Sequence, residues 1–184
     1  MKAALFPALL LAACSSDASR IRPPDPAAIA TLQQINAFGP QRVTDSMAKS
    51  DGYLVWVTDH ISTADTTWLI AASLLRPVAQ GSVATALDLA FASALPREPE
   101  TVLRLVGDST SHFSIAAVCR ADIVSDTTDA VRTDTLNHAH ELAVVASLLP
   151  VLSPDLAGRR DSCRSALNAS AAARAEATEK RKRR

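Results

Sequence analysis

Residues 62–107 read STADTTWLIAASLLRPVAQGSVATALDLAFASALPREPETVLRLVG, and this stretch predicts an all-α fold. Apolar residues recur in it every three or four positions, which is the period of one helix face. Pro77, Pro96 and Gly107 interrupt the pattern, so it divides into three helices. A capping box of Ser62 and Asp65 opens the first helix, and Pro99 opens the third. The apolar faces are Trp68, Ala71, Ala72 and Leu75 in the first helix, Val83, Leu87, Ala90, Phe91 and Ala94 in the second, and Leu103 and Val106 in the third. Helices joined by such short links pack as antiparallel neighbours.

The segments before this stretch also predict helices. Asp25 followed by Pro26 is an N-cap with proline at the first helical position, and Gly39-Pro40 ends the helix that follows. A polar stretch at 41–49 adds another turn or two. The segment 52–61 has high β-propensity and is compatible with a strand. We predict a buried helix there, because a lone strand has no partner for its backbone groups.

The segments after it continue the helical pattern. Ser114 is a candidate cap for a turn that carries Val118 and Cys119. From about residue 127 a longer helix runs to Pro150, and the last helix starts at Ser153-Pro154. The expected inner stripes are Leu142, Val145, Ala146 and Leu149 in the first of these and Leu156, Cys163 and Leu167 in the second. Beyond Asn168 we expect frayed helix or disorder, because the apolar pattern ends there.

Composition agrees with a small bundle of about five to seven helices. Hydrophobic residues make up 48% of the 184, enough for one core, while aromatics at 4% and only five glycines disfavour a β-barrel or sandwich. We divide the chain into a leader at 1–13, a flexible tether at 14–25, a helical domain at 26–168 and an Ala-rich, basic tail at 169–184. The formal net charge is zero, but residues 180–184 are all basic. These cations either complement the dipole of a terminal helix or contact anionic lipid or a cell-wall polymer.

The first residues predict where the chain works. Lys2 is followed by a short apolar run and then by Leu11-Ala12-Ala13-Cys14. This order resembles the signal peptide of bacterial lipoproteins, which implies cleavage before Cys14, a diacylglycerol on its sulfur and an acyl chain on the new amino terminus. The alternatives are an ordinary secretory signal and a membrane span, but a span needs roughly 20 apolar residues. In such lipoproteins Ser15, not Asp, after the cysteine implies sorting to the outer membrane, facing the periplasm. The acyl chains would then bind the membrane, and no nucleic acid is expected as a partner.

The remaining two cysteines fit this oxidising compartment. Cys119 and Cys163 form an even pair once Cys14 is committed to lipid. We predict a disulfide between them, worth roughly 4 kcal/mol by the loop-entropy model. The alternative is two buried free thiols that pack as small hydrophobes.

One short motif raises the possibility of hydrolysis. Gly107-Asp108-Ser109 resembles the nucleophile block of GDS-type esterases. That family also needs an Asp-x-x-His pair, a Gly-x-Asn-Asp segment and a doubly wound sheet, and the residues after Ser109 supply none of them. We therefore interpret the motif as a helix-ending glycine and a polar loop.

Titratable and aromatic residues form two further groups. His138 and His140 lie about 200° apart on a helix and should not share a metal, whereas Asp134 and His138 share a face. We expect His138 at the edge of the core, beside the stripe of Leu142, and no metal or other cofactor. Asp59-His60 with Ser62 holds triad residue types without triad spacing. Trp56 and Trp68 are either core residues or a binding platform.

A wider resemblance covers roughly residues 65–165. The runs Trp68–Leu75, Ala86–Pro96, Val102-Leu103 and Val118-Cys119 resemble small helical bacterial envelope proteins of uncharacterised function, which implies no activity and no catalytic residues. We expect a protein that is not an enzyme and that acts by contact with an envelope protein as an accessory factor. The alternatives are an immunity protein against a periplasmic toxin and a cell-wall or lipid enzyme that uses Ser109, His112 or His138.

Overall fold

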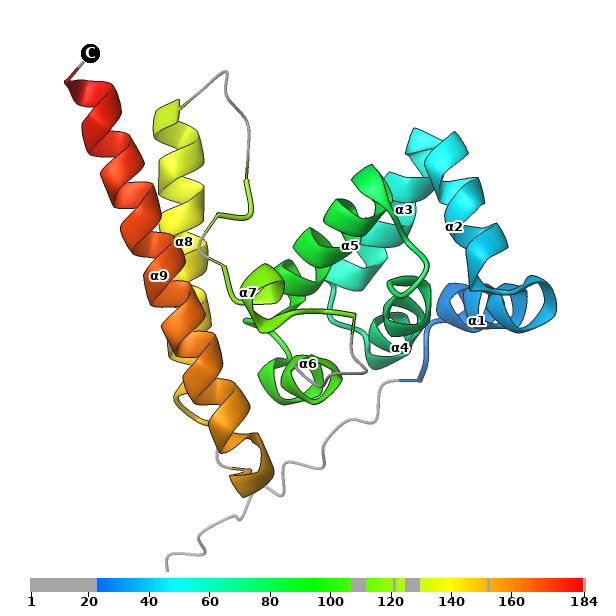
Figure 1. Ribbon diagram of the computed structural model, residues 1–184. Helices are drawn as coiled ribbons and strands as arrows, with labels where there is room; N and C mark the ends of the chain where they lie inside the picture. The colour runs from blue at the N-terminus through cyan, green and yellow to red at the C-terminus, as the bar shows by residue number, and fades with distance from the viewer. Residues whose placement is uncertain (1–22, 107–111, 121, 125–129, 152, 184) are drawn as a thin grey trace, which may run out of the picture.

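The fold is all-α, as the sequence predicts. A computed structural model describes residues 23–106, 112–120, 122–124, 130–151 and 153–183, and within these ranges it contains helices and no strand (Figure 1). The helices are α1 (Pro26–Phe38), α2 (Pro40–Lys49), α3 (Asp51–Ser62), α4 (Thr66–Leu75), α5 (Gly81–Ala94), α6 (Pro99–Leu105), α7 (Ile115–Val118), α8 (Ala130–Leu148), the 3₁₀ turn η1 (Pro154–Leu156) and α9 (Ala157–Lys182). This described part already exceeds the five to seven helices expected, because residues 40–49 form a separate helix and residues 115–118 a short one.

The ends of α1 follow the predicted signals. Asp25 Oδ1 accepts a hydrogen bond of 2.9 Å from the Ala27 amide, and Pro26 takes the first helical position. Gly39 ends the helix with φ +82°, a conformation that L side chains rarely adopt, and its N–H donates to Ile35 O at 2.8 Å. The glycine therefore lets α2 start directly after α1.

The start of α4 differs from the prediction. The N-cap is Asp65, whose Oδ1 accepts hydrogen bonds from the amides of Thr67 (2.9 Å) and Trp68 (3.3 Å). Ser62 is instead the last residue of α3, and its hydroxyl donates to Thr58 O at 2.8 Å. The capping box was wrong because the predicted helix over 52–61 runs on to include the serine. That helix forms as predicted but is only partly buried, with Val57 and Ile61 inside and Val55 and Trp56 exposed.

The core forms around α5, which packs against α3 and α7. The three helix faces predicted from residues 62–107 are buried, and the largest fully buried side chains include Trp68, Phe91 and Phe113. The rings of Phe91 and Phe113 stack with centroids 3.9 Å apart, which brings the segment before α7 onto α5. The core is therefore continuous from α1 to α9.

The two longest helices, α8 and α9, lie side by side at the opposite edge of the molecule from α1 and α2 (Figure 1). The last helix does not end near Asn168 but continues to Lys182. The prediction of frayed helix or disorder for that segment was wrong, since Ala is the strongest helix former and α8 supplies polar partners. The basic residue Lys180 lies in the last turns of α9, where a cation complements the helix dipole.

Candidate functional site

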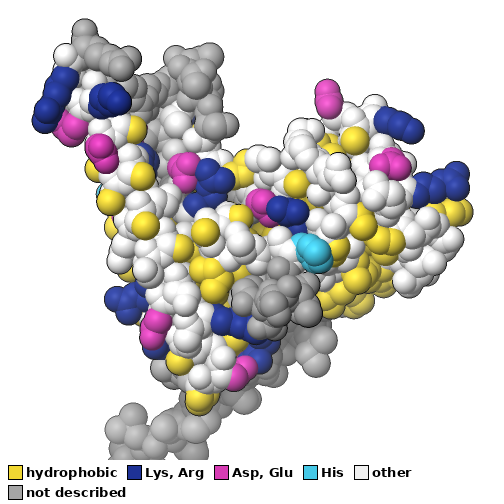
Figure 2. Space-filling view, in the orientation of Figure 1, with side chains coloured by type: hydrophobic (Ala, Val, Ile, Leu, Met, Phe, Trp, Pro, Cys, Tyr) yellow, Lys and Arg dark blue, Asp and Glu magenta, His cyan; other side chains and the backbone are white. Residues whose placement is uncertain are grey.

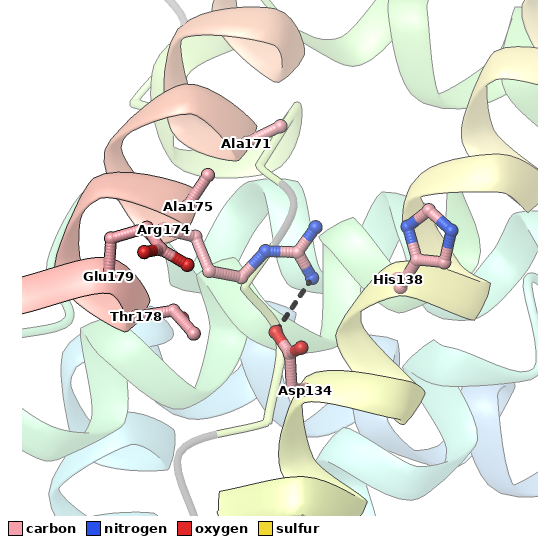
Figure 3. A pocket seen from close by; sticks show the side chains of 7 residues that line it. All are labelled: Asp134, His138, Ala171, Arg174, Ala175, Thr178 and Glu179. Carbon is pink, nitrogen blue, oxygen red and sulfur yellow. Dashed lines mark ion pairs between the residues drawn. The ribbon is translucent and has the colours of Figure 1, made fainter. Parts of the chain in front are cut away.

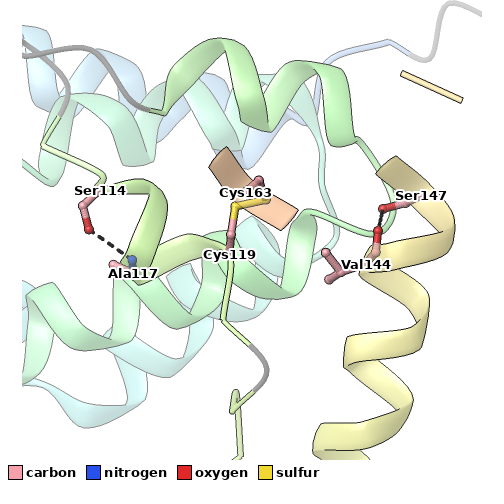
Figure 4. Close-up of a disulfide and its surroundings, with 6 residues drawn as sticks. All are labelled: Ser114, Ala117, Cys119, Val144, Ser147 and Cys163. Atoms are coloured by element: carbon pink, nitrogen blue, oxygen red, sulfur yellow. Dashed lines mark hydrogen bonds between the residues drawn. A yellow bond between two sulfur atoms is a disulfide. The ribbon is translucent and has the colours of Figure 1, made fainter. Parts of the chain in front are cut away.

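The predicted disulfide links α7 to α9. The sulfur atoms of Cys119 and Cys163 lie 1.99 Å apart and their Cα atoms 5.2 Å apart, and both residues are buried. Ser114 caps the short α7, accepting a hydrogen bond of 3.1 Å from the Ala117 amide (Figure 4). Both thiols are therefore consumed in structure and take no part in a catalytic site.

The C-terminal part of α8 exposes a row of apolar side chains. Leu142 and Val145 of α8, together with Leu149 directly after its last residue, are 56%, 39% and 68% exposed, and we call these three residues the α8 outer stripe. The prediction that this stripe faces the core was wrong, because Val144 and Leu148 on the opposite side of the helix are the buried residues. An amphipathic surface helix normally turns polar residues outward. A row of exposed large aliphatic side chains is therefore a candidate interaction surface.

The buried amide of Asn137 determines which way α8 faces. Its Oδ1 accepts hydrogen bonds of 2.9 Å from the amides of Ile123 and Val124, and its Nδ2 donates to Val124 O at 3.0 Å. Turning α8 by half a revolution would break all three bonds, and each buried polar group left without a partner costs about 1–3 kcal/mol. Asn137 thus holds Leu142 and its neighbours in the stripe at the surface.

The two histidines of α8 lie on different faces, as expected. His140 is buried and its pKa is lowered, because burial disfavours the imidazolium more than the Arg120 backbone carbonyl stabilises it. His140 Nε2 has no hydrogen-bond partner among the described residues. The exposed His138 lies with Nδ1 3.5 Å from Glu141. His140 therefore occupies the position at the edge of the core that was expected for His138, because α8 is turned about its axis relative to the predicted orientation.

A pocket of about 260 Å³ lies between α8 and α9, with Arg174 at its centre (Figure 3). Arg174 Nη2 donates to Glu141, and Arg174 Nη1 lies 3.8 Å from Asp134. Asp134 and His138 both line the pocket, so they share a face as predicted, but the partner of Asp134 is Arg174. Because two carboxylates already more than offset the single charge of the guanidinium, this pocket is a helix–helix contact with no positive charge left for an anion. Arg174 was not among the predicted site residues; its signal in the sequence is the pair of acidic positions Asp134 and Glu141, seven apart on one helix.

The aromatic residues of α3 and α4 form a cluster. The Trp56 ring lies 5.4 Å from the Trp68 ring and 4.6 Å from the His60 ring, centroid to centroid. Trp68 is fully buried and Trp56 partly exposed, so one tryptophan belongs to the core and the other is available at the surface. Asp59, His60 and Ser62 do not form a triad, since His60 Nδ1 lies 2.7 Å from Trp56 O and Ser62 bonds to the α3 backbone.

Other predicted site residues remain without structural support. Cys14 and the block Gly107-Asp108-Ser109 lie outside the described residues. His112 is exposed at the start of the segment that leads into α7. Within the described ranges, His, Cys, Asp and Glu side chains do not gather in a group of three or more suited to a metal ion. None of the helices described there combines the length and hydropathy that a membrane span requires.

Comparison of the chain with family models, with curated proteins and with solved structures finds no match. The α8 outer stripe is therefore identified as a candidate site by its exposure and chemistry.

Proposed function

We propose that this chain is a lipid-anchored protein of the outer membrane that faces the periplasm and acts, without catalysis, by binding another envelope protein. Two features support the proposal. The segment Leu11–Cys14 has the order of a lipoprotein signal, and α8 exposes an apolar stripe. The second observation carries the binding role, because exposed apolar rows rimmed by polar residues mark protein contacts.

The stripe suits a helix or an apolar groove of the partner. Leu142, Val145 and Leu149 follow one another at spacings of three and four residues, the anchor pattern of a helix that lies in a groove. Arg132 and Asp134 are exposed on the same helix at least eight residues before Leu142, so polar side chains of both signs lie at that end of α8. Such an arrangement gives a small contact that the membrane anchor supplements by confining both proteins to one surface.

Photocrosslinking in cells tests the binding role. A photoreactive amino acid placed at Leu142 or Leu149 of the full-length protein is expected to give a discrete adduct with an envelope protein. The same group at Gln33, an exposed position of α1, is the matched control and is expected to give none. Mass spectrometry of the adduct separates a resident partner from a toxin, which would support the immunity role.

Two results would count against the proposal. If positions 142 and 149 give no adduct beyond that seen at position 33, the stripe does not bind a protein. If metabolic palmitate labelling fails on the full-length chain but succeeds on a known lipoprotein, the anchor is absent. The variant Leu142→Ser/Leu149→Ser should keep its thermal stability, since surface substitutions usually stay within about 0.5 kcal/mol.

A further inference from the structure

The chain enters its helical domain at a fixed point. Asp25 Oδ1 caps α1 through the Ala27 amide, while Asp25 Oδ2 accepts a hydrogen bond of 2.9 Å from the indole N–H of Trp68. The carboxylate is thus held on two sides, by α1 and by α4. Any tether before Asp25 therefore starts from the junction of these two helices.

The helices at and beside this junction carry four exposed apolar side chains. Ile29 lies one turn after Asp25 on α1, Ile70 and Leu74 lie on the outer side of α4, which packs against α1, and Trp56 touches Trp68. All four are between 39% and 43% exposed, and we call them the α1–α4 face. Figure 2 shows hydrophobic side chains gathered along the lower edge of the right-hand part of the molecule, where α1 and α4 lie in the same view of Figure 1.

The length of the tether keeps this face close to the membrane. In the proposed mature chain, the eleven residues 14–24 precede Asp25. Fully extended they span at most about 40 Å, at 3.3–3.6 Å per residue. A tether of this length keeps the domain at an effective concentration in the millimolar range near the membrane surface, so even a weak contact with that surface would be occupied for much of the time. The proposed anchor therefore joins the domain at the junction of α1 and α4, on the helices that carry most of the α1–α4 face.

We propose that the α1–α4 face docks on the phospholipid surface that carries the lipid anchor. The inference rests on the proposed anchoring and adds an orientation to it. Tryptophan favours the boundary between headgroups and acyl chains, and branched aliphatic side chains insert beside it. The helix α8, which carries the α8 outer stripe, lies at the opposite edge of the molecule from α1 (Figure 1), so the two apolar surfaces belong to different parts of the domain.

The contact is apolar and should not depend on salt. The Asp25 carboxylate, at the start of α1, is already bonded to an indole and an amide, and the four residues that define the face carry no charge. Added salt screens charges but leaves apolar burial intact. The basic residues 180–184 could also attract anionic lipid, but that attraction would weaken steeply as salt is added.

Lipid quenching of Trp56 tests the proposal on the full mature chain. The protein is held on vesicles of phosphatidylethanolamine and phosphatidylglycerol (3:1) whose acyl chains are brominated near the headgroup. If Cys14 is acylated, the native lipoprotein is reconstituted; if it is not, the free Cys14 thiol is coupled to a maleimide lipid, since the other two cysteines form the disulfide. Failure of the anchor and failure of docking are thereby distinguished.

The chain contains two tryptophans and only Trp56 is exposed, so quenching reports on this face. We expect brominated lipid to quench the fluorescence, at low and high salt alike, and Trp56→Phe to remove the effect. Ile70→Ser/Leu74→Ser should lower the ratio of docked to undocked protein about tenfold, because it removes two apolar side chains from the contact. Leu142→Ser/Leu149→Ser is the matched control on the other face and should leave quenching unchanged.

Several outcomes would overturn the proposal. One is equal fluorescence of the anchored protein on brominated and unbrominated lipid. A second is an equal loss of quenching in the α4 variant Ile70→Ser/Leu74→Ser and in the Leu142→Ser/Leu149→Ser control, with both still folded by circular dichroism. A third is quenching that disappears in high salt, which would point to the basic tail. A Trp56 response to soluble cell-wall glycan fragments without one to lipid would identify a sugar site instead.

Discussion

The indole of Trp68 donates a hydrogen bond of 2.9 Å to Asp25, 43 residues earlier in the chain. The same carboxylate caps α1, so one side chain both starts a helix and satisfies the only polar atom of a fully buried tryptophan side chain. This pair fixes where α1 begins relative to α4. The first helix is thereby joined to the core by a polar contact in addition to its apolar face.

Asp25→Ala should destabilise the protein by about 2–4 kcal/mol. The loss combines an N-cap, worth about 1 kcal/mol, with a buried indole N–H left unpaired, worth about 1–3 kcal/mol. Urea denaturation measures the free energy of unfolding. Asp65→Ala is the matched control, because Asp65 caps α4 without a bond to a side-chain donor, and should cost only about 1 kcal/mol. Equal losses in the two variants would mean that the bond to Trp68 contributes nothing.

Local sequence signals could predict most of this fold but not its long-range pairs. Proline, glycine and capping residues mark helix ends within a few positions, and α1, α4, α5 and α6 lie close to their predicted ranges. The role of Trp68 in holding Asp25 could not be predicted, because the two residues are far apart in sequence. For the same reason, the sequence could not decide whether Trp56 and Trp68 lie in the core or form a binding platform.

Removing the disulfide should lower stability by about 4 kcal/mol. The cysteines are 44 residues apart, and a closed loop of that size is worth roughly this much in the unfolded chain. For a chain of this length the melting temperature should fall by about 8–16 °C. Differential scanning calorimetry of Cys119→Ala/Cys163→Ala measures the change. Reductant should lower the melting temperature of the wild type and leave the variant unaffected; an equal effect on both would refute the assignment.

Acidification should destabilise the protein through His140. Burial lowers the pKa of His140 in the folded state, whereas in the unfolded chain it titrates near pH 6.5. The unfolded state therefore binds a proton that the folded state does not, as the pH falls below about 6.5. The stability that neutral His140 contributes is fully present above this pH and is lost below it, at up to about 1.4 kcal/mol per pH unit, until the folded pKa is reached.

Urea denaturation of His140→Gln at pH 7.5 and pH 5.0 measures this contribution. The variant should lose less stability than the wild type over that interval. The pKa of Asp122, two residues after Arg120, is lowered: burial raises it, but the hydrogen bonds and charge of Arg120 and the hydrogen bond from the Ser170 hydroxyl more than compensate. Asp122 consequently titrates below this interval. The control His138→Gln, at an exposed position, should follow the wild type; a His140→Gln profile parallel to the wild type would contradict the prediction.

The rotation of α8 and the length of α9 could not be predicted from the sequence. Apolar residues occupy two faces of α8, so the helical period is clear while the inward direction is not. Asn137 determines that direction by hydrogen bonds to residues 123 and 124. Similarly, α9 loses its apolar stripe after Asn168 and is held there by polar contacts, such as the Ser170 hydroxyl that donates to Asp122 Oδ1 at 3.0 Å. Contacts of this kind leave no periodic signal.

The pair of Arg174 and Glu141 should stabilise the end of α9. Their side chains are only 17% and 21% exposed, and the guanidinium also lies near Asp134. A double-mutant cycle with Arg174→Ala and Glu141→Ala should give a coupling energy of about 1–2 kcal/mol, since hydrogen bonds between charged groups are strong where solvent is partly excluded. The matched pair is Arg104 and Asp155, with side chains 52% and 58% exposed and 2.7 Å apart. An exposed pair of this kind should give less than about 0.5 kcal/mol.

Loss of the bond between Arg174 and Glu141 should also unwind the last turns of α9. The residues after Asn168 lack an apolar stripe, so Arg174→Ala should reduce the helical signal at 222 nm at temperatures well below the main unfolding transition. Arg104→Ala should leave that signal unchanged, because Arg104 lies in α6 and pairs with Asp155 in η1. If both cycles give the same coupling and neither variant loses helix, the intrinsic propensity of the Ala-rich segment alone is enough to hold α9 to its end.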